Sequence, residues 1–201
     1  ADRVRASVFA RGAEVIVAEN GCFTHAQQDD ERNPDDIDEL TFFYFGADQE
    51  KYHLDWFLDN LGKYCDFQSK KVFLIGRGLS RFGKYPFVEL LGHMSLDEFV
   101  SFVAKKRTRF SWGVVPLSPL PAGSDVIPIK SMDYLSAGLP VLHSEACMSC
   151  VRSTPALLSY NYLDVRDFEN ALASSVSSTR SAAALRREVQ LLSNENSWNT
   201  K

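Results

Sequence analysis

The sequence predicts an α/β domain in which helices cover both faces of one parallel β-sheet. Short runs that are apolar at every position alternate along the chain with segments of helical periodicity. Strands of this kind are buried on both faces, which is typical of parallel sheets. Glycine or proline follows most of the runs, as expected where a strand passes into a loop. The runs predict strands near 41–45, 72–75, 87–90, 110–115 and 140–143.

The segments between the strands carry helix signals. Residues 54–61 repeat leucine and phenylalanine at helical spacing, and Gly62 follows them. Ser95 and Glu98 have the capping-box spacing at the start of a second helix. Two further helical patterns occupy 168–176 and 185–192 near the end of the chain.

Composition limits the classes of function. The chain has 201 residues, 45% of them hydrophobic, and a net charge of -4, which argues against electrostatic binding of nucleic acid. No apolar run approaches the ~20 residues that span a bilayer, and no signal peptide is recognisable. Four cysteines do not form a disulfide framework in a chain of this length, so we expect a reducing, cytoplasmic setting. The start at Ala1 predicts an excised fragment or a processed chain.

The domain organisation changes near residue 40. Residues 14–19 read as a short buried strand that ends at the turn dipeptide Asn20-Gly21. Residues 26–39 are polar and acidic, as in an exposed linker. We therefore divide the chain into a segment 1–39 and a domain 40–201.

The most informative segment is 125–142, DVIPIKSMDYLSAGLPVL. Pro128 suits the first position of a helix, Gly138 its C-terminal stop, and Pro140 prevents continuation. Lys130 and Asp133 share one face of this helix, close to the N-terminus that favours anions. A cation and a carboxylate at this place suit a phosphorylated ligand that also bears hydroxyl groups.

Other candidate residues follow the predicted strands, at the sheet edge where ligands bind in such folds. The residues at these strand ends are Gly46, Gly76, Arg77, Gly78, Gly92 and His93, together with the loop 118–127. Arg77 could contact phosphate oxygens, although a plain turn is as compatible with one G-x-G.

Each candidate has a simpler interpretation. Asp125 could cap the helix, Asp133 could be solvated, and Lys130 could be a surface lysine paired with Asp133 or Asp97. His93 could be an exposed loop histidine. Lys51, placed in the first turn of a helix, could be a surface charge. Cys147 and Cys150 have neither a second cysteine pair nor a matching histidine pair, so we assign no metal.

The residues also carry a family resemblance. PIKSMDYLSAGLPVL resembles the P-x-K-x-x-E-Y-L-x-x-G-x-P-V-V segment of GT-B-fold glycosyltransferases of the group 1, or family 4, type. Other segments resemble the family in the same order. EVIVAENG resembles the end of the acceptor-side domain at the crossover, FFYFGADQEK the first strand and loop of the Rossmann-like donor-binding domain, and KVFLIGRG its second strand and glycine loop. LLGHMSLDEFVSFV is similar to the family's G-x-v-s-x-e-e-l segment. Asn196-Ser197-Trp198 resembles the opening of its last helix. The resemblance covers 14–198.

The resemblance implies a nucleotide-sugar donor, UDP- or GDP-linked, and no other cofactor. By position, Asp133 would bind the ribose hydroxyls, and Lys130 with Arg77 the diphosphate, beside Gly46, Lys51 and Gly76. Backbone at His93 and Met94 would contact the base. Asp125 stands where many members have a glutamate that contacts the donor sugar, which makes it the catalytic candidate. Asp125 and Asp133 replace glutamates, and Ala47 stands where the family has arginine.

The resemblance further implies a hexosyltransferase, as in polysaccharide biosynthesis, that acts on a glycan or lipid-linked acceptor. The acceptor would bind an N-terminal domain outside this chain, which could attach the protein to the inner face of a cell membrane. We expect this chain alone to be inactive. Two alternatives remain open: a nucleotide- or phosphosugar-binding module without chemistry, and an α/β domain that binds protein partners.

Overall fold

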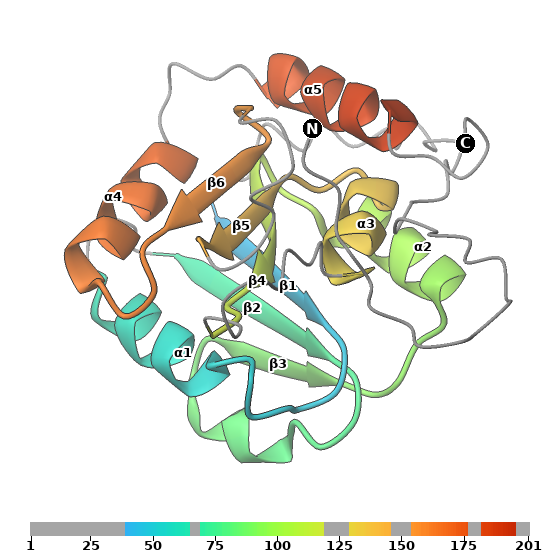
Figure 1. Ribbon diagram of the computed structural model, residues 1–201. Coiled ribbons are helices and arrows are strands. Elements are labelled where there is room, and N and C mark those ends of the chain that lie inside the picture. The colour runs from blue at the N-terminus through green and yellow to red at the C-terminus, as the bar shows by residue number, and fades with distance from the viewer. Residues whose placement is uncertain (1–38, 65–68, 119–128, 146–153, 177–181, 196–201) are drawn as a thin grey trace, which may run out of the picture.

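The structure is a computed structural model that describes residues 39–64, 69–118, 129–145, 154–176 and 182–195 (Figure 1). Several features predicted from the sequence lie outside the described residues. They are the strand 14–19, most of the acidic linker, Asp125, Pro128, the pair Cys147 and Cys150, and residues 196–198.

The described residues form one six-stranded sheet in the order β3-β2-β1-β4-β5-β6. All five strand pairs are parallel, as the apolar runs predicted. The strands are β1 (Leu40–Phe45), β2 (Lys70–Ile75), β3 (Val88–Leu91), β4 (Phe110–Val115), β5 (Val141–Ser144) and β6 (Leu157–Tyr160). The fold is therefore an α/β domain with the doubly wound strand order of Rossmann-like folds.

The sixth strand is the main addition to the predicted sheet. β6 pairs with β5 at one edge, from Val141↔Leu157 to Ser144↔Tyr160. Its four residues include an exposed serine, Ser159, so the sequence shows no continuous apolar run there. Within the described sheet only one of its long sides is paired, and this relaxes the need for apolar residues at every position.

Helices cover both faces of the sheet (Figure 1). Side chains alternate between the two faces along β1, and their contacts identify the helices on each face. Phe42 packs edge-on against Phe57 of α1 (Leu54–Lys63), which in turn contacts Phe168 of α4 (Val165–Ser175). Its neighbour Phe43 points to the other face, against Phe102 of α2 (Leu96–Lys106).

The second face also holds α3 (Ile129–Ser136) and α5 (Ala182–Glu195). Helix α3 contacts β4, β5 and α5, and α5 buries Val189 and Leu192. A short 3-10 helix, Ser80–Lys84, lies beside β3. No helix in the described ranges is long and apolar enough to cross a membrane.

Two predicted helix boundaries are confirmed in detail. Ser95 caps α2: its hydroxyl accepts from the Glu98 N–H at 3.3 Å, while the Glu98 carboxylate accepts from the Ser95 N–H at 2.7 Å. Gly138 ends α3 in a left-handed conformation, φ +75°, and donates its N–H to the Leu135 carbonyl at 3.0 Å.

Candidate functional site

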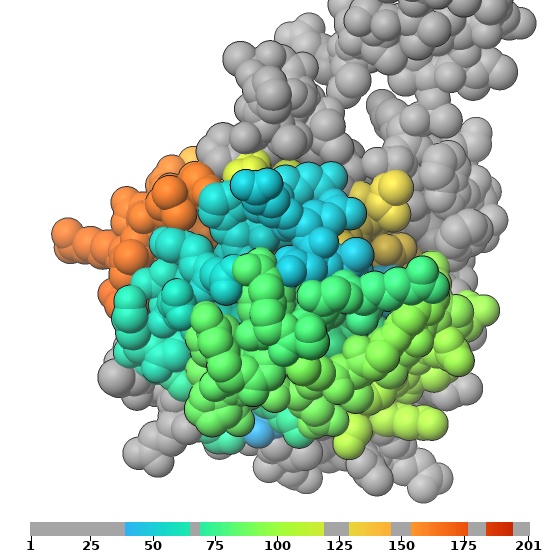
Figure 2. Space-filling model, turned by 90° about the horizontal axis from the view of Figure 1, so that it is seen from below, coloured from blue at the N-terminus to red at the C-terminus, as the bar shows by residue number. Residues whose placement is uncertain are grey.

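The candidate site lies where the strand order reverses, between the carboxyl ends of β1 and β4. The loop after β1 is held from both sides by backbone hydrogen bonds: Asp48 N–H donates to Arg77 O at 3.0 Å, and His53 N–H donates to Pro116 O at 2.9 Å. In Figure 2 this loop is the blue segment at the surface, beside the yellow α3. Open α/β sheets bind ligands at such switch points.

Glycine is required at the ends of both β1 and β2. Gly46 has φ +147°, and a Cβ there would lie 1.6 Å from the Lys130 Nζ. Gly76 has φ +150°, and a Cβ there would lie 2.0 Å from the Gly46 carbonyl oxygen. The two glycine turns and the lysine of α3 therefore pack directly on one another. The sequence prediction that Gly46, Gly76 and Lys130 share one site is consistent with this geometry.

Lys130 reaches across the switch point rather than out to solvent. Its Nζ donates a hydrogen bond to the Phe45 carbonyl oxygen at 2.8 Å. The same ammonium lies 4.8 Å from the ring centre of Tyr44 and 4.7 Å from that of Tyr52. The simpler interpretation of Lys130 as a surface lysine paired with Asp133 or Asp97 is therefore wrong.

Burial lowers the pKa of Lys130 from 10.5 to about 8. The carboxylate of Asp133 opposes this shift, whereas the charge of Lys51 adds to it. The site thus brings a second lysine charge close enough to disfavour the charged form of Lys130.

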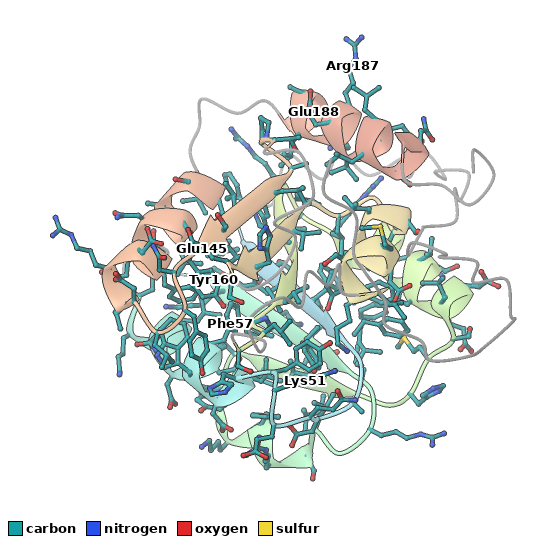
Figure 3. The ribbon with its side chains drawn as sticks, in the orientation of Figure 1. Lys51, Phe57, Glu145, Tyr160, Arg187 and Glu188 are labelled. Carbon is teal, nitrogen blue, oxygen red and sulfur yellow. The ribbon has the colours of Figure 1, made fainter. Side chains whose placement is uncertain are left out.

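Lys51 provides the second cation. Its Nζ lies 5.4 Å from the centre of the Tyr52 ring, so the same ring contacts both ammonium groups. Its side chain is exposed, and Figure 3 shows it in the loop after β1. The sequence placed Lys51 in the first turn of a helix, but α1 begins only at Leu54. The loop is longer than predicted because Tyr52 forms a bridge with Leu117 before the helix starts.

Asp133 is half-buried on α3, so the interpretation of a merely solvated carboxylate is also wrong. Burial raises its pKa from 3.8 to about 6, against the opposing effect of Lys130. Within the described ranges no residue donates a hydrogen bond to this carboxylate. Among these residues, none competes with a ligand for its acceptor oxygens.

The remaining candidates are placed less closely together. The Arg77 side chain is exposed and forms no ion pair with any residue that the structure describes, while its carbonyl holds the loop after β1. His93 and Met94 follow β3, which β2 separates from β1. His93 is exposed, and Met94 packs partly against the core. Asp125 lies outside the described residues.

Sequence reasoning missed the role of Tyr134. Its hydroxyl accepts a hydrogen bond from the Phe45 N–H at 3.0 Å and donates one to the Val114 carbonyl at 3.1 Å. Gly113 was the available signal, because glycine inside a buried strand marks a close approach. A Cβ on Gly113 would lie 2.3 Å from Cγ of Tyr134.

Sequence reasoning also missed an ion pair that holds the loop after β1. The guanidinium of Arg81 donates to both carboxylate oxygens of Asp48, at 2.8 and 3.2 Å, and also lies 2.9 Å from Asp55. No periodic signal links these residues in the sequence. Among the described residues, no group of three or more acidic, histidine or cysteine side chains could hold a metal ion.

Comparison with known proteins finds this architecture in glycosyltransferases. Anabaena HepE, solved with UDP and glucose, aligns with a TM-score of 0.58 and 12% identity over 79% of this chain. The catalytic domain of a cholesterol-α-glucosyltransferase from Helicobacter pylori aligns with a TM-score of 0.60 and 10% identity over 78% of this chain and 98% of its own. No protein-family model and no curated protein matches the sequence.

A third neighbour shows which part of these enzymes corresponds to this chain. It is the C-terminal domain of a group 1 glycosyltransferase, LpcC, from Francisella tularensis, with a TM-score of 0.59 and 9% identity. The alignment covers 89% of this chain and 97% of that domain. The chain has the fold of a GT-B C-terminal domain. The alignments span 44% of the HepE chain and 52% of the chain of the galactosyltransferase WaaB, about half of each.

Proposed function

We propose that this chain is the donor-binding domain of a glycosyltransferase and binds a nucleotide sugar at the carboxyl edge of its sheet. The observation that carries the proposal is the position of Lys130. Helix α3 delivers its ammonium to the glycine turn after β1, at the point where the strand order reverses. HepE, which shares the fold, was solved with UDP-glucose.

The charges of the site suit a diphosphate. Lys130 and Lys51 both contact the Tyr52 ring, and their mutual repulsion favours an anion beside them. Gly46 and Gly76 let the turns after two adjacent strands pack against each other and against Lys130, because a Cβ at either glycine would overlap these atoms. Arg77, exposed after β2, adds a third cation at this edge. Charge-assisted hydrogen bonds to phosphate are among the stronger polar contacts in proteins.

Asp133 is the proposed ribose ligand. It lies on α3 one helical turn after Lys130, and its carboxylate receives no hydrogen bond from the described residues. A carboxylate can accept bonds from two neighbouring hydroxyl groups at once. The proposed nucleotide therefore spans α3, with phosphates at Lys130 and ribose at Asp133. The base would lie near the backbone of His93 and Met94, and Asp125 would contact the sugar that is transferred.

The proposed reaction is transfer of a hexose from the UDP- or GDP-linked donor to a glycan or lipid-linked acceptor. The acceptor would bind a second domain, because the chain spans about half of HepE and WaaB. Within this division of labour, the present chain holds the donor and its leaving diphosphate. The cations at the end of β1 would stabilise the charge that develops on the leaving group.

Titration calorimetry with UDP, GDP and ADP and their glucose conjugates tests the proposal. We expect one of these nucleotides to bind, and Lys130→Ala to lower its affinity by about 10- to 100-fold, as loss of a charge-assisted contact does. Lys106→Ala removes an exposed charge at the end of α2 and is the matched control. The proposal fails if none of the nucleotides binds, or if both variants bind as the unmodified chain does.

A further inference from the structure

The hydrogen-bond ladder between β1 and β4 stops before either strand ends. Pairing runs from Leu40↔Phe110 to Phe43↔Gly113, although β1 continues to Phe45 and β4 to Val115. The two strands therefore separate at their carboxyl ends, below the candidate site. Backbone groups left unpaired in a buried place carry a free-energy cost unless another group bonds them.

The Tyr134 hydroxyl occupies this separation. It accepts the Phe45 N–H of β1 at 3.0 Å and donates to the Val114 carbonyl of β4 at 3.1 Å. One side chain from α3 thus replaces the ladder between the two strands. The side chain is fully buried, and its ring fits over Gly113 and edge-on against Phe99.

Phe45 links this bridge to the candidate site. Its N–H is held by Tyr134, and its carbonyl oxygen accepts the hydrogen bond from the Lys130 ammonium at 2.8 Å. Both partners come from α3 and lie four residues apart, on one helix face. The position of the Lys130 ammonium therefore depends on Phe45, and the Tyr134 hydroxyl fixes the backbone of Phe45.

We infer that Tyr134 is a positioning residue for donor binding, because its hydroxyl fixes the Phe45 backbone and thereby the Lys130 ammonium against the donor phosphates. The inference rests on the proposed function. A tyrosine that only fills space would behave differently, because phenylalanine keeps the ring over Gly113 and loses only the hydroxyl. Tyr134→Phe therefore separates positioning from packing.

A double-mutant cycle on UDP or GDP affinity, with whichever nucleotide the unmodified chain binds, tests the coupling. Tyr134→Phe should weaken nucleotide binding about tenfold, since it leaves two buried backbone groups unpaired. In the Lys130→Ala background the same change should have little further effect, because the group it positions is already absent. Tyr85→Phe removes the hydroxyl that bonds Asp59 at 2.6 Å and serves as the control, with unchanged affinity expected.

Amide hydrogen exchange at Phe45 gives a readout that needs no ligand. In the unmodified chain the Phe45 amide should be protected, and Tyr134→Phe should accelerate its exchange at least about tenfold. The Gly46 amide, bonded to Ile75 O at 2.8 Å, should change less. A Phe45 amide that exchanges in the unmodified chain as fast as that of the exposed Ala47 would overturn the inference even if the variant did not fold.

The outcomes of the cycle separate the two proposals. Equal affinity in Tyr134→Phe and the unmodified chain overturns the positioning role alone. An equal loss of affinity with and without Lys130 also overturns it, because the hydroxyl would then act by another route. If the unmodified chain binds no nucleotide, the proposed function fails, and the positioning role for a donor fails with it.

Discussion

Lys130 and Asp133 show how one environment acts on two opposite charges. Burial lowers the pKa of the lysine to about 8 and raises that of the aspartate to about 6, while their mutual attraction limits both shifts. Each charged form is therefore less favourable here than in water. A ligand that brings phosphate oxygens to one and hydroxyl groups to the other would offset this cost, which is why we assign both residues to binding.

The Asp133→Asn variant should separate binding from folding. It removes a charge that burial disfavours, so the melting temperature should stay the same or rise. Nucleotide affinity should fall about tenfold or more, because a charged acceptor is lost, whereas pyrophosphate affinity should change little. Glu169→Gln removes an exposed carboxylate on α4, which covers the other face of the sheet, and is the control. A variant that unfolds without a specific binding defect would make Asp133 a structural residue.

The pKa of Lys130 predicts the pH dependence of nucleotide binding. An ammonium with a pKa of about 8 loses its proton between about pH 7 and pH 9.5, so affinity should fall about tenfold across this range. The same group should make the free domain more stable as pH rises from about 8 to 10.5, because the unfolded chain then binds more protons. Calorimetry at several pH values should show no such fall for Lys130→Ala. A fall of equal size in that variant would assign the titration to another group.

At the scale of the elements, α3 was predictable and its principal contacts were not. Proline, glycine and the spacing of apolar residues are local signals, and they placed the helix and its end at Gly138 correctly. The bridge made by Tyr134 depends on where β1 and β4 separate, which is a matter of strand register. The paired residues of β1 and β4 lie about 70 positions apart in the sequence. Gly113 is the only local sequence signal of their register that we recognise. The short edge strand β6 was missed for a related reason, since its exposed Ser159 breaks the apolar run.

Gly113 offers a direct test of the contact between β4 and α3. A Cβ at this position would lie 2.3 Å from Cγ of the Tyr134 ring, so Gly113→Ala should force the two elements apart. Overpacking of this kind costs about 1–3 kcal/mol of unfolding free energy. Gly92→Ala is the matched control, because a Cβ there meets nothing within 4 Å. Urea denaturation of both variants measures the difference, and equal stability would contradict the tight contact.

At the scale of the whole molecule, the order of the strands along the chain predicted the fold class and the sheet edge that carries the site. It did not show that the loop after β1 contacts the segment after β4 through His53 and Pro116, or that Lys130 turns inward to Phe45. These contacts arise from the packing of α3 on the sheet. Residues 1–38 and Asp125 lie outside the described residues, so the roles assigned to them stay predictions.

The fold also predicts what residues 1–201 do in isolation. Group transfer gains much of its rate from holding two substrates in one geometry, and this chain spans about half of HepE and WaaB. We expect the chain alone to bind a donor without transferring its sugar to an acceptor. An assay for transfer from UDP- or GDP-glucose to added glycans measures this directly. Sustained turnover would contradict the division into a donor half and an acceptor half.

The location of bound nucleotide is the measurement that tests the central claim most directly. Amide chemical shifts recorded during a titration with UDP or GDP report which parts of the sheet sense the ligand. The account predicts the largest changes at the carboxyl edge, at Gly46, Gly76 and Lys130, and small ones at the opposite edge, at Leu40, Lys70 and Phe110. Changes centred on the amino ends of the strands, or no changes with either nucleotide, would contradict it.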